Sequence, residues 1–298
     1  MKCLVVGCGY VGLPLGIELV RLGHEVSGLR RNTSAETELK AVGIQPLFGD
    51  VTRPETLAML PRKFDWVVNC VASSGGNAED YRQIYLQGTR HLIEWLSPAP
   101  PNKFVYTSST SVYGQTDGLQ VKESSPTEPL AESTKILVET EKLLLAAAKG
   151  RKFPAVILRV AGIYGPDRGY WFKQFLRNEA RIEGDGSRFL NIIHRDDLIG
   201  CIIAALKNGR PGEIYNAVDD EPVSQMNVFQ WLAEELGKAL PPSAPENFTE
   251  NRKRSVTNKR VSNRKLKMEL GYQFKYPNFR EGYTAEILRL ERAGVLEP

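Results

Sequence analysis

Residues 3–12 read CLVVGCGYVG, and this stretch decides the fold. Four apolar residues lead into three glycines spaced as GxGxxG, and a helical run begins at Pro14. In such a loop the first glycine permits a tight turn, the second lets the backbone approach a pyrophosphate, and the third lets the helix pack on the strand. The helix N-terminus offers N–H groups and a positive dipole end to the phosphates. A dinucleotide site is therefore predicted, with a purely structural turn as the alternative. Its expected contacts are Gly7, Gly9, Tyr10, Val11 and Gly12.

Outward from this loop, short β-rich runs alternate with longer helical patterns over the first two-thirds of the chain. Helices are expected at Glu79–Leu96 and Glu132–Lys149, where apolar residues recur at spacings of three and four. Most of the strand runs are continuously apolar, which is typical of strands covered on both faces. The alternation predicts an α/β fold of the Rossmann type, a doubly wound parallel sheet. The expected strands are Cys3–Gly7, Glu25–Leu29, Pro46–Phe48, Trp66–Val71, Phe104–Thr107 and Val156–Val160.

The pattern becomes irregular after Val160 and rich in glycine and aromatic residues. We expect residues 1–165 to form the nucleotide-binding domain, to which residues 190–210 return. Residues 166–298 should form mainly a smaller, interleaved substrate lobe. The later elements are expected at Leu190–Ile193, Asp197–Lys207, Gly212–Asn216, Ser224–Gly237 and Asn278–Ala293.

The composition predicts a cytoplasmic protein without a metal site. No apolar stretch approaches the roughly 18 residues that a membrane span needs, and the glycine loop begins too early for a signal peptide before it. No pair of cysteines follows a CxxC pattern, so the thiols are expected to be reduced and mostly buried. These cysteines are Cys3, Cys8, Cys70 and Cys201.

The charge is unevenly distributed, although the net charge is only +4. Residues 251–267 carry eight Lys and Arg side chains and no acid, from Arg252 to Lys267. A solvated face is the expected reading of such a run, with a surface for an anionic phosphate group as one alternative and nucleic-acid contact as another. We expect no nucleic-acid partner.

The end of the second strand favours NADP over NAD. An NAD site normally carries Asp or Glu there to bind the ribose 2′-hydroxyl, whereas this strand ends in Arg30 and Arg31. Two guanidinium groups suit a 2′-phosphate. NAD is the alternative, and both arginines could instead solvate a loop.

Two further segments are candidates for cofactor contacts. Asp50 and Val51 follow the third strand, where they would meet adenine, although Asp50 could equally cap the next turn. Ala72 begins a loop of small residues after the fourth strand, where backbone can lie against the nicotinamide half of a cofactor. An ordinary flexible loop is the alternative there.

Three motifs later in the chain resemble one enzyme family. The opening alone resembles the nucleotide-sugar dehydrogenases, but FVYTSSTSVYG at 104–114, LRVAGIYGPDR at 158–168 and NIIHRDD at 191–197 decide against them. Their order and sequences resemble the extended short-chain dehydrogenases/reductases, the NAD(P)-dependent epimerase/dehydratase family. The resemblance covers nearly the whole chain. It also suggests a homodimer, because the helices at 79–96 and 132–149 correspond to those that often pair across dimers in this family.

The resemblance implies catalytic roles that this chain fills only in part. Ser109 stands where the family uses Ser or Thr to hydrogen-bond the substrate oxygen. Lys135 stands at the lysine of the YxxxK motif, which holds the nicotinamide ribose, but Ala131 replaces the tyrosine that is the general acid/base. A positioned proton donor typically contributes about 10²–10⁴ in rate. The chain thus resembles atypical members of the family.

Other residues bear on the absence of the YxxxK tyrosine. Tyr113, Tyr164 or Tyr170 could supply a displaced phenol, although a core or substrate-wall role is favoured for each. Tyr85 replaces an asparagine that is usual in the family. For His194 and Asp197, structural hydrogen bonding is favoured over substrate contact.

These observations leave two functions open. The favoured one is an NAD(P)-dependent oxidoreductase or epimerase/dehydratase-like enzyme with an altered catalytic set. Its substrate would be a small hydroxyl or carbonyl compound, with sugar nucleotides as candidates. The alternative is a catalytically silent NADP(H)-binding redox sensor or regulatory protein.

Overall fold

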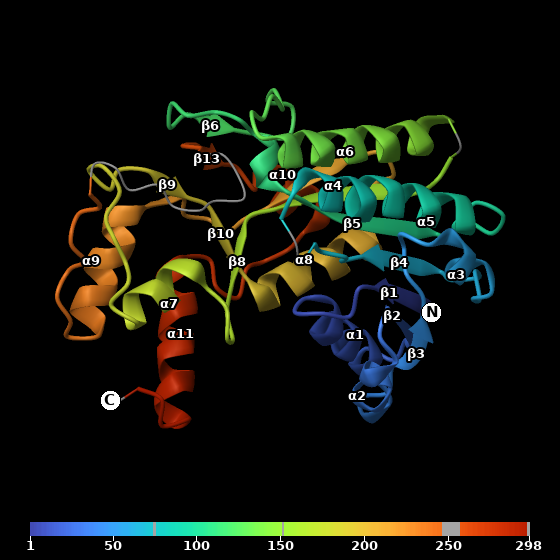
Figure 1. Cartoon of the computed structure of the whole chain (residues 1–298), viewed down its shortest axis with the longest axis horizontal. Helices are drawn as coiled ribbons and strands as arrows, with labels where there is room; N and C mark the ends of the chain where they lie inside the picture. Colours follow the sequence, from blue (N-terminus) through green and yellow to red (C-terminus); the bar gives the residue numbers. More distant parts are fainter. Residues whose placement is uncertain (74–75, 151, 246–256, 297–298) are drawn as a thin grey trace.

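The computed structural model describes residues 1–73, 76–150, 152–245 and 257–296, and a seven-stranded parallel sheet forms its centre (Figure 1). The strand order is β11-β7-β5-β4-β1-β2-β3, so the chain reverses its direction of travel between β1 and β4. Ligands of doubly wound sheets bind at such a switch point, beyond the carboxyl ends of the strands. The strands are β1 (Lys2–Val6), β2 (Glu25–Arg30), β3 (Gln45–Phe48), β4 (Trp66–Asn69), β5 (Lys103–Ser109), β7 (Ala155–Val160) and β11 (Ile214–Ala217).

The predicted Rossmann-type fold is confirmed, and the central strands show why it could be read from the sequence. All residues of β4 and β7 are buried, as their mainly apolar sequences predict for strands covered on both faces, and the buried residues include Asn69 and Arg159. Val6 pairs with Leu29 on one side and with Asn69 on the other, so the carboxyl ends of β1, β2 and β4 lie at one edge.

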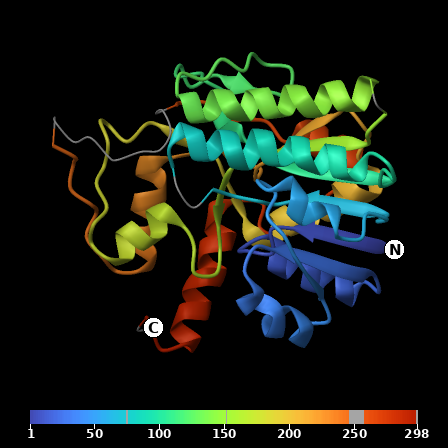
Figure 2. The same cartoon turned by 45° about the vertical axis from the view of Figure 1, so that its right-hand side comes forward.

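Helices cover both faces of the sheet (Figures 1 and 2). One face carries α1 (Gly12–Arg21) and α8 (Arg195–Asn208), and the other carries α6 (Glu132–Gly150) beside a long helix that runs from Ala78 to Leu96. That long helix consists of α4 (Ala78–Tyr81), a π-helical segment η2 (Arg82–Gln87) and α5 (Gly88–Leu96). The remaining elements of this lobe are η1 (Thr33–Ala35), α2 (Glu36–Ala41), α3 (Pro54–Ala58), η3 (Thr110–Val112), β6 (Gln120–Val121), β13 (Arg260–Val261) and α10 (Arg264–Leu270).

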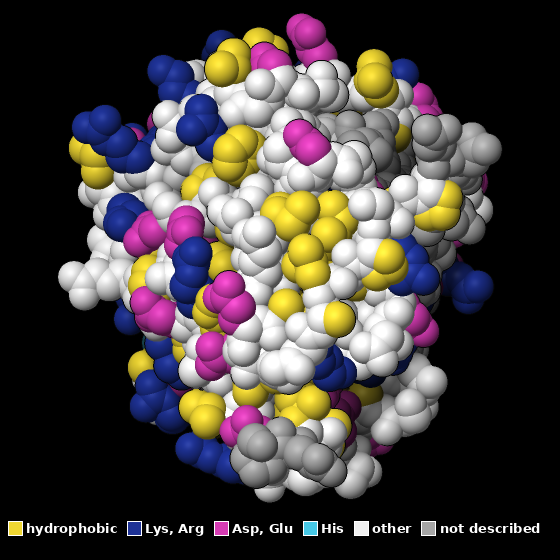
Figure 3. Space-filling view, turned by 90° about the vertical axis from the view of Figure 1, so that its left-hand side faces the viewer, with side chains coloured by type: hydrophobic (Ala, Val, Ile, Leu, Met, Phe, Trp, Pro, Cys, Tyr) yellow, Lys and Arg dark blue, Asp and Glu magenta, His cyan; other side chains and the backbone are white. Residues whose placement is uncertain are grey.

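A second lobe has its own hydrophobic core, in which Phe172, Phe229 and Tyr283 are buried. Its helices stand apart from the sheet (Figure 1), and hydrophobic side chains gather near the middle of its outer face (Figure 3). The lobes interleave further than residues 190–210, because β11 and α10 also pack into the first core. The elements here are β8 (Gly162–Tyr164), α7 (Tyr170–Leu176), β9 (Phe189–Leu190), β10 (Ile192–His194), β12 (Val223–Ser224), α9 (Gln225–Glu235) and α11 (Phe279–Arg292).

Part of the basic run, residues 252–256, lies outside the described part of the chain. Of the rest, Lys265 forms an ion pair with Glu213 at 2.6 Å, and Lys267 forms one with Asp220 at 2.9 Å. These two lysines therefore bind acids of the folded chain.

No helix among the described residues is long and apolar enough to cross a membrane. Within the same residues, no three His, Cys, Asp or Glu side chains lie where they could together hold a metal ion. All four cysteines are free thiols.

Candidate active site

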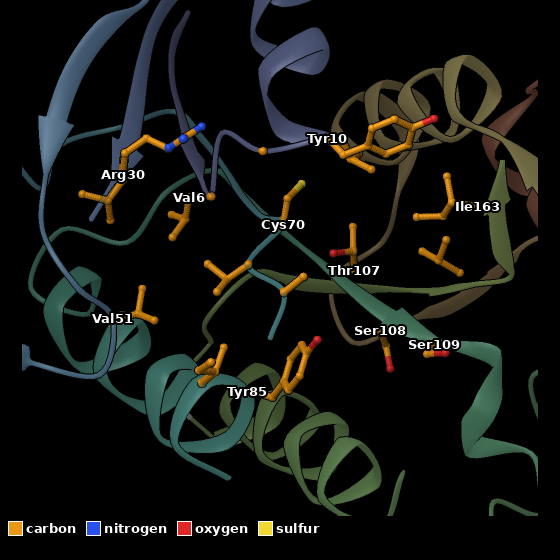
Figure 4. A pocket seen from close by; sticks show the side chains of 18 of the residues that line it. Val6, Tyr10, Arg30, Val51, Cys70, Tyr85, Thr107, Ser108, Ser109 and Ile163 are labelled. Atoms are coloured by element: carbon orange, nitrogen blue, oxygen red, sulfur yellow. The ribbon is translucent and has the colours of Figure 1, made fainter. Parts of the chain in front are cut away.

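A pocket of about 550 Å³ lies beyond the carboxyl ends of the strands, at the switch point between β1 and β4 (Figure 4). The ends of β1, β2, β3, β4, β5 and β7 all contribute to its wall. The predicted contacts in its lining are Gly7, Gly9, Tyr10, Val11, Arg30, Arg31, Asp50, Val51, Ala72 and Ser109.

The three glycines of the first loop have three different physical reasons to be glycine. Gly7 has a φ of 89°, and a Cβ there would lie 3.0 Å from the backbone of Val71. A Cβ on Gly12 would lie 2.2 Å from the carbonyl oxygen of Gly7, so only glycine lets α1 approach β1 this closely. A Cβ on Gly9 would meet nothing within 4 Å, so the space above Gly9 is open to a ligand.

The N-terminus of α1 adjoins the glycine loop, and within its first turn the Leu13 N–H donates to the Gly9 carbonyl oxygen while Pro14 has no N–H. No described side chain caps the helix, and its first turn carries no acidic residue. An anion at this position would meet the positive end of the helix dipole. The glycine loop and α1 therefore fit the pyrophosphate of a dinucleotide.

Tyr10 joins the glycine loop to residues beyond β7. Its ring lies beneath two guanidinium groups, with Arg168 at 4.9 Å and Arg195 at 5.4 Å from the ring centroid. Burial raises the pKa of Tyr10 to about 12, against the opposing effect of the two arginines. Arg168 also lines the pocket, with its guanidinium over the Tyr10 ring. It adds a positive charge that the sequence did not single out.

The end of β2 supplies two more positive charges. The Arg30 guanidinium donates a hydrogen bond to the carbonyl oxygen of Cys8 in the glycine loop, and Figure 4 shows this side chain beside Val6. Arg31 is exposed at the rim. The two residues thus place two guanidinium groups at this end of the pocket.

Asp50 lines the same end of the pocket while also ordering its own loop. Its Oδ1 accepts hydrogen bonds from the backbone N–H of Thr52 at 2.9 Å and from the Thr52 hydroxyl at 2.8 Å. Asp50 therefore both lines the pocket and stabilises the turn that follows it.

The opposite end of the pocket carries hydroxyl groups on β5. Thr107, Ser108 and Ser109 all line it, and Figure 4 shows them along one strand. Ser109 Oγ accepts the backbone N–H of Ser111 at 3.2 Å, which fixes its orientation where η3 begins. Ser109 thus lies at the end of the pocket away from Arg30.

A buried polar network lies behind β5. Ser108 donates to Glu141 at 2.6 Å, and Glu141 forms an ion pair with Arg159 at 2.7 Å. Arg159 in turn donates to the hydroxyl of Tyr113 at 2.8 Å, and that hydroxyl donates to Asn216 at 2.8 Å. Burial raises the pKa of Tyr113. The Tyr113 phenol thus belongs to the core.

The structure does not bring Lys135 or Ala131 into the pocket. The Lys135 side chain is 53% exposed and forms an ion pair with Glu132 at 3.5 Å. Leu137, two residues further on α6, lines the pocket instead. Positions two apart on a helix point in nearly opposite directions, so Lys135 faces solvent while Leu137 faces the sheet. The YxxxK pattern predicted that the face of α6 carrying Lys135 would point into the pocket, but Lys135 lies on the exposed face.

The other sequence candidates lie elsewhere. Tyr164 is buried against His194 and Tyr283, and burial raises its pKa. Tyr170 is half exposed and stacks edge-on against Trp171, outside the pocket lining.

His194 and Asp197 both make structural hydrogen bonds. His194 caps α8 by accepting the backbone N–H of Asp196. Asp197 accepts hydrogen bonds from the Tyr272 hydroxyl and from two backbone N–H groups, at 2.7–2.9 Å.

Comparison with known proteins gives a consistent result. The sequence profile of the NAD dependent epimerase/dehydratase family matches residues 3–217. The chain is 27% identical over 287 residues to "Protein YeeZ" of Escherichia coli, covering 93% of this chain and 97% of that protein. It is 28% identical over 223 residues to human dTDP-D-glucose 4,6-dehydratase, covering 70% of this chain and 62% of that enzyme.

Solved structures show the same relationship. A Methylobacillus flagellatus protein provisionally described as an NAD-dependent epimerase/dehydratase is 34% identical, with a TM-score of 0.75, covering 97% of this chain and 98% of its own. A dTDP-glucose 4,6-dehydratase of Streptomyces venezuelae, solved with NAD and TYD bound, superposes with a TM-score of 0.83. At 24% identity over 100% of this chain and 99% of its own, it supports the fold alone.

Proposed function

Because the chain belongs to the NAD-dependent epimerase/dehydratase family, we propose that it is an NADP(H)-dependent oxidoreductase acting on a hydroxyl or carbonyl compound. The family and the fold support an NAD(P) cofactor, and NADP is the finer proposal. Sugar nucleotides are the first substrates to test, since relatives such as the human enzyme bear the name of a sugar-nucleotide dehydratase.

One observation carries this proposal. A single pocket connects the open space above Gly9 and the Arg30 guanidinium to the hydroxyl of Ser109. A dinucleotide bound along the glycine loop would therefore extend from a phosphate-binding end to a hydroxyl-bearing end. This arrangement suits hydride exchange with a substrate held at Ser109.

The residues of the chain have separate tasks in this account. When bound, the nicotinamide group supplies or accepts the hydride. Gly9 and the α1 N-terminus hold the pyrophosphate, and Arg30 and Arg31 hold a 2′-phosphate through charge-assisted hydrogen bonds. Ser109 donates a hydrogen bond to the substrate oxygen and orients the carbon that reacts.

The composition of the pocket favours reduction or epimerisation over dehydration. Elimination of water needs a base for one proton and an acid for the departing hydroxyl. Among the described residues that line the pocket, Asp50 is the only carboxylate, and it lies near Arg30 and the adenosine end. The Ser109 end thus lacks an acidic pair for elimination within the described lining.

The experiment is a comparison of wild-type protein with Ser109→Ala. NADPH oxidation is followed with a panel of carbonyl compounds that includes nucleotide-linked keto sugars. We expect NADPH affinity to stay within about twofold while kcat falls by about tenfold or more, because the variant loses an interaction with the reacting oxygen. Equal kcat values would place the reaction elsewhere. Cofactor binding without turnover of any compound would support the silent sensor instead.

A further inference from the structure

We propose that the phenol of Tyr85 donates the proton to the substrate oxygen, in place of the tyrosine that related enzymes carry on the helix equivalent to α6. This inference rests on the proposed function and names the acid that the proposed function lacks. Three observations support it: which side chains of α6 point at the pocket, where the Tyr85 hydroxyl lies, and what the other tyrosines contact.

The face of α6 that points at the pocket presents neither a phenol nor an ammonium group. Leu137 lines the pocket, and the residue one turn before it is Ser133, which is buried. Residues four apart share a face of a helix, so Ser133 and Leu137 occupy the pair of positions nearest the site. A proton donor must therefore come from another element.

Tyr85 reaches the pocket from the neighbouring helix. Its side chain lines the pocket, only 9% of the residue is exposed, and Figure 4 shows the hydroxyl end directed into the cavity. The residue lies in the π-helical segment η2, and π-helical turns are frequent at functional sites because they redirect a side chain. Segment η2 packs directly on α6, so Tyr85 and Leu137 share one corner of the pocket.

The hydroxyl of Tyr85 is fixed at the edge of the sheet that carries Ser109. It accepts the backbone N–H of Ser73 at 3.1 Å, and Ser73 lies in the loop that follows β4. Asn69, the last residue of β4, is paired with Tyr106 of β5, so this loop and Ser109 at the end of β5 lie at the same edge of the sheet. Tyr85 and Ser109 both line the pocket at this edge.

The other tyrosines are committed elsewhere. The described lining contains two tyrosines, Tyr10 and Tyr85, and Tyr10 lies under the guanidinium groups of Arg168 and Arg195 beside the glycine loop. Tyr113 is bonded to Arg159 within the buried network. Tyr85 is therefore the phenol whose position suits the Ser109 end.

The proton transfer balances in a simple way. In reduction, the carbonyl oxygen gains a proton as the O–H bond of Tyr85 breaks, and a bound reduced cofactor would supply the hydride that the carbonyl carbon needs. The N–H of Ser73 stabilises the phenolate that remains, and a proton from water restores the phenol. In oxidation the same steps run in reverse, with the phenolate as the base.

The test compares Tyr85→Phe with Tyr81→Phe in the full chain. Tyr81 lies one turn earlier on the same long helix, with its ring centroid 4.9 Å from that of Tyr85, but it does not line the pocket. Tyr85→Phe should lower kcat by about 10²–10⁴, the usual contribution of a general acid. Its NADPH affinity should stay within about twofold of wild type. Tyr81→Phe should keep kcat within about threefold.

A second readout does not depend on turnover. The ultraviolet absorbance of tyrosinate is followed against pH in the complexes with NADP⁺ and with NADPH, and the Tyr85→Phe signal is subtracted. A phenol beside the nicotinamide should ionise at lower pH with NADP⁺, because the oxidised ring carries a positive charge. Equal titration in both complexes would overturn the proposal.

The remaining outcomes separate this inference from the proposed function. If wild-type protein turns over a carbonyl compound and Tyr85→Phe keeps its kcat, the inference is wrong and the proposed function stands. If Tyr85→Phe loses NADPH affinity but keeps kcat at saturation, the phenol holds the cofactor and the proton comes from elsewhere. If wild-type protein binds neither NADPH nor NADH, the proposed function itself fails.

Discussion

Lys135 forms an ion pair with Glu132 on the solvent side of α6, two residues before Leu137, which lines the pocket. The lysine that the YxxxK pattern assigns to the nicotinamide ribose thus lies on the far side of the helix from the site. The chain retains the glycine loop and the serine of the family pattern, but residue 131 is alanine and the Lys135 side chain is exposed.

Lys135→Ala therefore tests whether the Lys135 side chain points away from the pocket. An exposed ion pair contributes about 0–1 kcal/mol, so the free energy of unfolding should change little. NADPH affinity, measured by isothermal titration, should stay within about twofold of wild type. A loss of about tenfold or more, which corresponds to about 1.4 kcal/mol, would show that Lys135 reaches the ribose.

The two glycines of the loop should respond differently to the same substitution. In Gly9→Ala the new methyl group enters open space, so the melting temperature should stay near that of wild type while NADPH affinity falls by about tenfold or more. In Gly12→Ala the methyl group meets the carbonyl oxygen of Gly7, which should destabilise the fold by about 1–3 kcal/mol. Thermal denaturation and NADPH titration on both variants measure the contrast. Unchanged NADPH affinity in Gly9→Ala would place the pyrophosphate elsewhere.

Arg30 and Arg31 should determine the preference between the two cofactors. Hydrogen bonds to charged groups contribute about 1.5–3 kcal/mol each, so replacing both residues by Ala should remove the preference for NADPH and leave NADH affinity nearly unchanged. Arg53→Ala is the matched control, because Arg53 is exposed nearby but does not line the pocket. A double variant that still prefers NADPH would mean that another group, such as Arg168, binds the 2′-phosphate.

The buried network behind β5 should contribute strongly to stability. Glu141→Leu leaves the Arg159 guanidinium buried without its acidic partner, and breaking such a pair costs about 3–5 kcal/mol. Ser108→Ala removes one hydrogen bond to the same carboxylate and should cost about 1.5–3 kcal/mol. Urea denaturation of the two variants gives both values. A cost for Glu141→Leu no larger than that for Ser108→Ala would show that the ion pair adds nothing to the network.

The fold could be predicted because its signals are local. Mainly apolar runs such as Val156–Val160 mark strands buried on both faces, and the spacing of the three glycines in the first loop marks the turn between β1 and α1. The short α10 was not predicted, because a run of basic residues conceals its two buried leucines, Leu266 and Leu270.

The site could be predicted only in part, because its remaining features depend on packing. The YxxxK spacing predicts that residues 131 and 135 share a helix face, but α6 begins only at Glu132, and the burial of Ile136, Leu137 and Leu144 fixes which of its faces meets the sheet. A charged residue on the other face cannot override that packing. The sequence marked Tyr85 as unusual, but the π-helical turn that aims it at the pocket has no local sequence signal. Arg168 was also missed, since its role depends on the approach of the Gly165–Gly169 loop to Tyr10.

The central claim is that this pocket binds NADP(H), and titration of the wild-type chain with NADPH and with NADH tests it most directly. Charge-assisted contacts to the 2′-phosphate predict that NADPH binds tighter than NADH by about tenfold to a hundredfold. The preference should weaken with added salt, because the partly exposed arginines are screened. Binding of neither cofactor, or equal binding of both, would contradict the account.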